Sequence, residues 1–161
     1  MKGHVERVIS LGFGYNIGED SDKHWGDRFG EGKWLRKPAM LVVTAGGWEE
    51  HLSARGIAGP IEDPLIPITL GMLFETGIEV PPSFVMHMND RLEDVAIKAA
   101  AAELRQELPS LFDTMPIAYQ QQSGGDYETL TLVLKPRLEI RVTTRFSLHR
   151  HTVDEADGAR S

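Results

Sequence analysis

Two adjacent glycines follow a short apolar run in the first third of the chain. The run covers residues 39–43, and the four residues after it are Thr44, Ala45, Gly46 and Gly47. In open parallel sheets, ligands bind beyond the carboxyl ends of the strands, and glycines there leave backbone N–H groups open to a ligand. The pattern therefore indicates a ligand-binding turn, with an ordinary strand-to-helix loop as the alternative.

A second glycine-rich segment, residues 12–18, places two aromatic side chains between glycines. Its sequence, GFGYNIG, resembles a dinucleotide-binding fingerprint, but the last spacing is one residue too long. A helix is also expected before it, where the fingerprint needs a strand. We therefore reject the fingerprint. Phe13 and Tyr15 could line an aromatic pocket or anchor the loop in the core, and both interpretations stay open.

The histidines do not form a metal or nucleophile pattern. His149 and His151 could share a metal with a third ligand, but such a pair near a charged terminus is usually exposed. His51 follows two acids and has no nucleophile to pair with. His24 lies in a charged segment with no visible partner. We predict no metal site and no side chain that acts as a general acid or base.

Acidic residues gather between the two glycine motifs. Asp20, Asp22, Asp27 and Glu31 have the composition of a calcium-binding loop, but not its spacing or its bidentate glutamate. A solvated loop is the simpler interpretation. Glycine and charge together predict that residues 12–33 form one long loop without regular structure.

The composition excludes several classes of protein. The chain has 161 residues, and 17 Lys and Arg against 24 Asp and Glu give a formal net charge of −7, which disfavours nucleic acid as a partner. The absence of cysteine excludes disulfides and thiolate chemistry. No apolar run approaches the roughly 20 residues needed to span a bilayer, and the N-terminus lacks the apolar core of a signal peptide. We expect one soluble, cytoplasmic domain.

Strands and helices are expected to alternate through the middle of the chain. Apolar spacing predicts a helix over residues 5–12, a buried parallel strand over 39–43, a second strand over 78–88 and a long helix over 91–108. A further helix is expected between the two strands. This order indicates an α/β architecture with right-handed crossovers.

The helix between the strands carries its own terminal signals. Asp63 could cap it, Pro64 suits its first position, and Gly77 would end it. Pro67 is tolerable only if it falls in the first turn, because proline has no N–H group for the helical ladder.

The last part of the chain has a different pattern. Apolar and polar residues alternate from Leu130 to Val142, with Lys135, Pro136 and Arg137 as a turn. Alternation with a central turn predicts a β-hairpin. The final ten residues are expected to form a frayed terminus.

Several motifs occur in an order that resembles one known family. In chain order they are KGHVERV, GFGY, WGDRFGEGK, VVTAGG, RGIAGPIED, GMLF and GGDY. Together they are similar to the NAD(P)H:quinone oxidoreductases, a family of flavodoxin-like folds that includes ancillary subunits of potassium efflux systems. The resemblance covers residues 1–127 and fades over 128–161. We therefore expect the C-terminal portion of a flavodoxin-like domain, followed by a hairpin or an irregular tail.

The resemblance implies an α/β, three-layer fold with a parallel sheet and a flavin, FAD or FMN, along the turn Thr44–Gly47. Backbone N–H groups of that turn would stabilise the negative charge that develops at the pyrimidine edge of the flavin. Leu52 is counted with this cofactor site because the family often has a flavin-bonding tyrosine there. Some members carry a histidine where this chain has Ala58. Neither side chain can exchange a proton, so no relay through these positions is expected.

The resemblance also implies substrates and an assembly. Phe13, Gly14 and Tyr15 would border the space that NAD(P)H and a quinone occupy in turn, which gives a two-electron ping-pong reaction. Because the family's sites lie at a dimer interface, a homodimer is implied, without a nucleic acid partner or a membrane span. The alternative function is a non-catalytic ancillary or regulatory protein that binds a partner, or a truncated remnant of such an enzyme.

The match to the family starts at an internal point of the family's pattern. Family members have further strands and helices, including the phosphate-binding loop, before the segment that matches Met1. The fold is therefore expected to be incomplete at the N-terminus, with apolar faces exposed at Leu41, Val43 and Phe84. The C-terminal hairpin could cover them.

Overall fold

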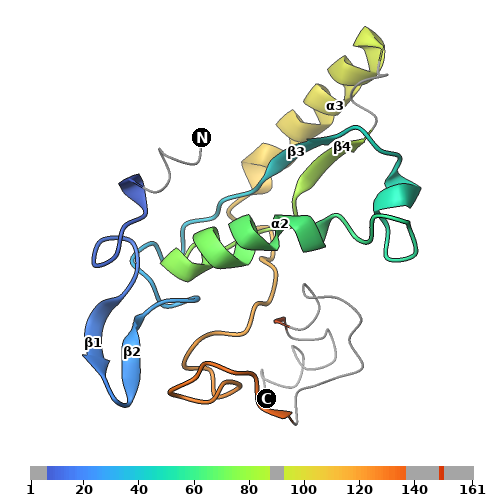
Figure 1. Ribbon diagram of the computed structural model, residues 1–161. Coiled ribbons are helices and arrows are strands. Elements are labelled where there is room, and N and C mark those ends of the chain that lie inside the picture. Colours follow the sequence, from blue (N-terminus) through green and yellow to red (C-terminus); the bar gives the residue numbers. More distant parts are fainter. Residues whose placement is uncertain (1–6, 88–92, 137–148, 151–161) are drawn as a thin grey trace, which may run out of the picture.

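The computed structural model describes residues 7–87, 93–136 and 149–150. Its longer elements, drawn in Figure 1, are β1 (Ile17–Ser21), β2 (His24–Asp27), β3 (Val42–Ala45), α2 (Glu62–Ile68), β4 (Phe84–His87) and α3 (Asp94–Glu107). Single 3₁₀ turns cover Glu49–Leu52, Phe74–Thr76 and Leu108–Ser110, and one π-helical turn covers Thr69–Leu73. The described strands form two separate pairs, β1 with β2 and β3 with β4.

The strands β3 and β4 pair in parallel, and α2 lies between them in the chain. Val42 pairs with Phe84, and Ala45 pairs with His87. The predicted order of strand, helix, strand and helix is therefore confirmed. β3 begins three residues later than expected, and before it Pro38 pairs with Glu79 in an isolated parallel bridge.

The helix after the glycine turn begins earlier than predicted and ends where predicted. Gly77 ends it with a φ of 87°, the left-handed conformation expected of a terminal glycine. Asp63 is not the cap, because the helix starts at Glu62 and the cap position falls on Ile61, whose side chain cannot accept a hydrogen bond. Pro67 therefore lies inside the helix rather than in its first turn, and the π-helical turn follows directly.

The long loop predicted for residues 12–33 contains a hairpin, so that prediction is wrong. β1 and β2 pair antiparallel, with Ser21 opposite His24 and a two-residue turn between them. These strands are polar and carry no apolar alternation, so their sequence gives no strand signal. A distant side chain holds them instead, because Gln122 Nε2 donates to the backbone oxygens of Trp25 and Gly26, at 3.2 and 3.1 Å.

The helix expected over residues 5–12 is shorter than predicted in its described part. Helical structure ends at Val8, and Leu11 pairs with Tyr15 in a single parallel bridge. The carbonyl of Ser10 accepts from the N–H groups of Phe13 and Gly14, which turns the chain sharply. Glycines in GFGY thus favour a tight turn over helix continuation.

The buried core lies beneath α2 and the turns that follow it. Ile66, Phe74, Val80 and Tyr119 form one cluster, in which the rings of Phe74 and Tyr119 are 5.1 Å apart. The Tyr119 hydroxyl donates to Thr69 Oγ1 at 3.0 Å, so the polar end of the tyrosine is satisfied inside the core. The core thus joins α2 to a segment about fifty residues later.

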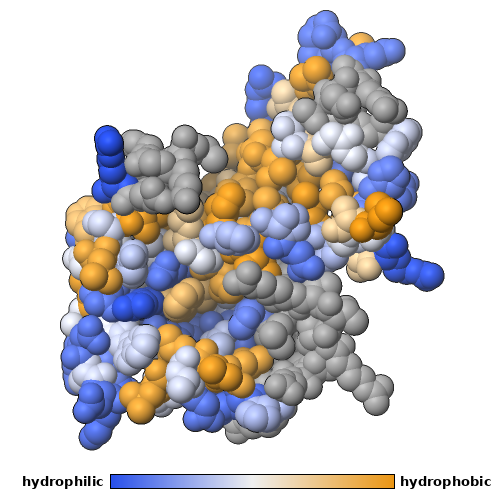
Figure 2. Space-filling model, in the orientation of Figure 1, coloured by the Kyte–Doolittle hydropathy of each residue, from blue (hydrophilic) through white to orange (hydrophobic). Residues whose placement is uncertain are grey.

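The face built by β3, β4 and α3 is less covered than the core. None of the fourteen described residues of α3 is buried, and its Val95 is 74% exposed. Val42 is 56% exposed, whereas Leu41, Val43 and Phe84, all expected to be exposed, are half-buried. Figure 2 shows apolar residues gathered over this region of the molecule.

The second half of the predicted C-terminal hairpin lies outside the described residues, because residues 137–148 are not described. In the described part, Tyr127 and Leu134 form one antiparallel bridge, and Leu132 has a φ of 50°. Residues 130–134 therefore do not form a strand. The predicted pair of His149 with His151 cannot be compared, since His151 also lies outside the described residues.

Tyr127 anchors the tail against His149. The two rings stack with centroids 6.2 Å apart, and the Tyr127 hydroxyl lies 3.1 Å from His149 Nδ1. Burial, with a smaller contribution from the Asp126 carboxylate, raises the pKa of Tyr127 from 10.0 to about 12. The folded protein therefore holds this proton more tightly than the unfolded chain does.

The free energy of unfolding of the wild-type protein is expected to fall as the pH rises above 10. In Tyr127→Phe the fall should be less steep. Because the pKa of Tyr127 is higher in the folded state, its contribution is complete below pH 10.0 and is lost as the pH rises to about 12. Burial also raises the pKa of Tyr119, so a slope remains in the variant. Urea unfolding at several pH values across this range measures both slopes. Equal slopes in the two proteins would contradict the assignment.

Candidate functional site

The turn predicted to bind a ligand lies at the carboxyl edge of the parallel strand pair. Thr44 and Ala45 are the last two residues of β3, and Gly46 and Gly47 follow directly. Ala45 pairs with His87, the last residue of β4, so both strands end at the same edge. Thr44 and Gly46 are exposed. A ligand can therefore reach the backbone of the turn at the edge where open α/β sheets bind their ligands.

Backbone N–H groups in this turn are available for binding. Among the described residues, no hydrogen bond involves the N–H group of Gly46, Gly47 or Trp48. Successive unpaired N–H groups at an exposed turn form a site for negative charge. The turn can thus donate hydrogen bonds to a ligand without any side chain.

Leu52 packs beside the glycines. A Cβ placed on Gly47 would lie 3.7 Å from Leu52 Cδ1, which is an ordinary van der Waals distance. The carbonyl of Leu52 accepts from the N–H group of Ile61 at 3.0 Å and closes the loop that follows the turn. Leu52 therefore supplies an apolar, half-buried wall next to the glycines and no hydrogen-bond donor.

Gly56 fixes the shape of the same loop. A Cβ at this position would overlap the backbone oxygens of Glu50 and His51. The carbonyl of His51 also accepts from the N–H group of Ala58 at 3.1 Å, and that of Ser53 accepts from Gly56 at 2.9 Å. The loop thus folds tightly back on the 3₁₀ turn that carries Leu52. Ala58 itself is exposed.

His87 belongs to this edge, although the sequence analysis did not single it out. Its Nδ1 atom is buried and has no hydrogen-bond partner among the described residues. The side chain lines a hollow of about 700 Å³ between β4 and α3. A buried ring nitrogen without a partner destabilises the fold unless something else bonds it. Its position at the end of a predicted strand, beside the strand that leads into the glycines, could have indicated it.

The aromatic residues predicted to contact substrate lie in a turn before β1. Phe13 is 48% exposed, meets Trp34 edge to face at 6.2 Å, and carries Lys33 Nζ over its ring at 4.3 Å. Gly14 is buried beside Trp34. Tyr15 is half-buried under the Arg28 guanidinium, 5.8 Å from the ring centroid. An exposed ring beside a cation can stack on a planar ligand.

The two groups of predicted site residues do not meet within one chain. The turn after β3 lies at the upper right of Figure 1, whereas the turn before β1 lies at its left. The structure therefore brings Thr44, Ala45, Gly46, Gly47 and Leu52 together, and separately brings Phe13, Gly14 and Tyr15 together.

A comparison with known families identifies the fold. Residues 1–108 match the family described as having a flavodoxin-like fold. The chain belongs to this family. The α/β, flavodoxin-like prediction is therefore confirmed for that part of the chain.

Relatives in the flavodoxin-like family carry related names. The chain is 47% identical over 152 residues to a ribosyldihydronicotinamide dehydrogenase-like protein of Penicillium crustosum, covering 94% of this chain and 56% of the relative. It is 30% identical over 127 residues to NAD(P)H dehydrogenase [quinone] 1 of Cavia porcellus, covering 78% of this chain and 43% of the relative. The chain thus spans about half the length of the curated relatives it matches.

A solved structure agrees with these relatives. A crystal structure of a Klebsiella pneumoniae protein, described as a candidate quinone reductase, superposes with a TM-score of 0.85 at 46% identity. The match covers 94% of this chain and 58% of that one. The predicted resemblance to quinone reductases is therefore confirmed. In the described part of the chain, no helix has both the length and the apolar character needed to cross a membrane.

Proposed function

We propose that this chain is part of a flavin-dependent NAD(P)H:quinone oxidoreductase that works by two-electron, ping-pong transfer. The observation that carries the proposal is that the N–H groups of Gly46, Gly47 and Trp48 have no hydrogen-bond partner among the described residues and follow β3 at the carboxyl edge of the parallel strands. The names of two relatives, both dehydrogenases, support the same reaction class. A cytoplasmic location is part of the proposal, because NAD(P)H is an intracellular reductant.

The residues of the turn fit the pyrimidine edge of a flavin, FAD or FMN. A bound flavin would supply the redox chemistry, taking a hydride from NAD(P)H and giving it to a quinone. The exposed backbone of Thr44 and Gly46 leaves room for a flat ring to approach, and the free N–H groups would hydrogen-bond its carbonyl oxygens. Leu52 would cover one side of the site and exclude water.

The alternative is a non-catalytic partner-binding protein of the same family. Leu52 and Ala58 favour it, because neither can hydrogen-bond a flavin or move a proton. Under the enzyme proposal these substitutions would lower the rate without abolishing the reaction, since the redox step belongs to the flavin and the donors belong to the backbone.

The separation of the two groups of residues supports a homodimer. The turn before β1, which carries Phe13 and Tyr15, lies on the opposite side of the molecule from the turn after β3 in Figure 1, so it does not cover the glycine turn of its own chain. In a dimer with two-fold symmetry, the aromatic turn of each copy would lie over the flavin of the other. Each contact across such an interface occurs twice, so the dimer would have two equivalent sites. NAD(P)H and the quinone would then bind in turn between Phe13 of one chain and Thr44–Gly47 of the other.

Mixing two inactive variants is expected to restore activity if the site forms between two copies. Gly56→Ala distorts the glycine turn, and Phe13→Ala removes the aromatic cover, so each homodimer should reduce menadione with NADPH very slowly. Random re-association gives heterodimers with one intact site, and activity should recover to about a quarter of the wild-type value. If the mixture stays as inactive as the two separate variants, the site does not form between two copies. If the wild-type protein does not reduce menadione, the proposed enzyme activity is wrong.

A further inference from the structure

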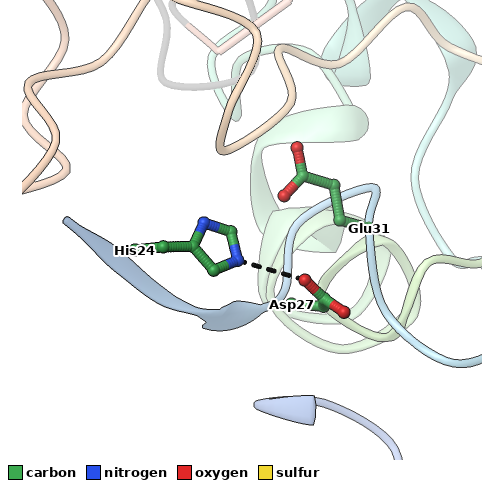
Figure 3. A group of neighbouring side chains, drawn as sticks. All are labelled: His24, Asp27 and Glu31. Carbon is green, nitrogen blue, oxygen red and sulfur yellow. Dashed lines mark hydrogen bonds and ion pairs between the residues drawn. The ribbon is translucent and has the colours of Figure 1, made fainter. Parts of the chain in front are cut away.

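Three side chains with metal-binding atoms lie together at the hairpin, outside the proposed flavin site. His24 and Asp27 belong to β2, and Glu31 follows it in the chain. Their nearest ligand atoms all lie within 4.8 Å of one another, and all three residues are half-buried. Figure 3 shows the imidazole and the two carboxylates arranged around one small space. In the sequence, Asp27 and Glu31 stood out only as members of an acidic cluster, and nothing connected His24 with them.

Two glycines explain why the backbone brings these side chains together. Residues three apart on a regular strand face opposite sides of the sheet. Gly26 has a φ of 40°, which breaks the alternation, so His24 Nε2 lies 3.1 Å from Asp27 Oδ1. Gly30 has a φ of 86° and turns the chain again before Glu31. The backbone conformation at these two glycines thus places the three side chains on the same side.

In the part of the chain that the structure describes, the two carboxylates lack a lysine or arginine partner. Among the described residues, neither Asp27 nor Glu31 forms an ion pair with lysine or arginine. Arg28, which follows Asp27 directly, is engaged elsewhere: its Nε donates to Asn16 Oδ1 at 3.0 Å, and its guanidinium lies over the Tyr15 ring. Two close carboxylates repel each other, and a divalent cation between them would remove that repulsion.

A distant residue holds the Glu31 carboxylate in place, and the Asp27 carboxylate lies close to β1. Glu31 accepts from Ser123 through both oxygens, from the backbone N–H group and from the hydroxyl, each at 3.0 Å. Asp27 lies against the backbone of β1, where a Cβ on Gly18 would be 2.8 Å from its Oδ2. Hydrogen bonds of this kind orient the carboxylate ligands of metal sites.

We propose that His24, Asp27 and Glu31 bind one divalent transition-metal ion, with Zn²⁺ as the best match. One imidazole nitrogen and two carboxylate oxygens suit Zn²⁺, which accepts three protein ligands and completes its shell with water. Ligand atoms around tetrahedral zinc are roughly 3.4 Å apart, since each bond is about 2.1 Å. The His24–Asp27 distance of 3.1 Å is already close to this value, and small rotations of Glu31 would complete the set.

Metal binding replaces the hydrogen bond between His24 and Asp27. Without metal, the nitrogen of His24 and the oxygen of Asp27 share one hydrogen bond; with metal, the ion would lie between them, and the Nε2 proton of His24 would move to Nδ1 or to solvent. The ion would then tie the β1–β2 hairpin to the turn at Gly30 and, through Ser123, to the segment that packs on the core. The site is therefore structural, and binding should weaken as the pH falls.

The full-length, metal-free protein titrated with Zn²⁺ in a calorimeter tests the site. We expect one ion per chain and at least tenfold weaker binding in His24→Gln and in Glu31→Gln. Asp22→Asn is the matched control, because it removes an acidic group from the exposed turn of the same hairpin. It should bind like the wild type, and Zn²⁺ should raise the melting temperature of both but not that of His24→Gln.

Two outcomes would overturn the proposal. One is the absence of Zn²⁺ binding in the wild type, and the other is unchanged affinity in both His24→Gln and Glu31→Gln. X-ray absorption on the wild-type zinc complex decides the case if a variant is poorly folded. One imidazole with oxygen ligands supports the site, whereas two or more imidazoles would place the ion elsewhere. Neither measurement depends on quinone reduction.

Discussion

Gly32→Ala is expected to lower the free energy of unfolding by about 3 kcal/mol, because it forces a methyl group into packed backbone. A Cβ on Gly32 would lie 2.8 Å from Thr76 Cα and closer still to the Thr76 carbonyl. The neighbouring backbone is fixed by hydrogen bonds from Gly30 to Phe74, at 2.8 Å, and from Trp34 to Thr76, at 2.9 Å. Neither segment can move aside without breaking these bonds. Urea unfolding at neutral pH measures the loss.

Gly71→Ala is the matched control for this substitution. Gly71 also lacks a positive φ, and the nearest atom to a Cβ there is Ile66 O, at 3.9 Å. The change should alter stability by no more than about 1 kcal/mol, since alanine is favoured over glycine in helical segments. A Gly32→Ala protein as stable as Gly71→Ala would show that the close approach of residues 32 and 76 is not as described.

Gly56→Ala is expected to reduce flavin retention at least tenfold, the largest effect of any single change near the glycine turn. A Cβ on Gly56 overlaps the backbone oxygens of Glu50 and His51, so the 3₁₀ turn must move. Leu52 moves with it and no longer packs beside Gly47. Displacement of about 1 Å in a positioning element is enough for a loss of this size. Flavin fluorescence titration measures the dissociation constant directly.

Gly59→Ala separates this effect from general backbone strain in the loop. Gly59 has a φ of 72°, but a Cβ there meets nothing within 4 Å. The variant should lose about 1 kcal/mol of stability through its left-handed backbone and keep its affinity for flavin. If Gly56→Ala, Gly59→Ala and the wild type bind flavin equally well, Gly56 does not position the flavin-binding turn.

The parts of the fold that follow local rules could be predicted from the sequence. The strand before the glycine turn, the end of the following helix at Gly77 and the long helix α3 have apolar spacing or terminal glycines that act locally. The resemblance to quinone reductases rested on motifs spread through the chain, so it did not depend on any one element. The glycine turn itself was visible because its carboxyl-edge position follows from strand order.

The parts that depend on distant contacts could not be predicted. The β1–β2 hairpin has no apolar alternation, and Gln122, almost a hundred residues away, holds it. Pro67 enters the helix interior because the helix starts at Glu62, with Ile61 rather than Asp63 at the cap position. The grouping of His24 with Glu31 depends on two positive φ angles that composition does not reveal. The sequence therefore located the flavin candidate but not the metal candidate.

An absorbance scan tests directly whether the turn Thr44–Gly47 binds flavin, as expected of a quinone reductase. The purified chain is incubated with excess FAD or FMN, desalted and scanned in the visible range. If the turn binds flavin in a quinone reductase, the protein retains a flavin band that NADPH bleaches and a quinone restores. A folded but colourless protein would contradict it and would favour the partner-binding alternative.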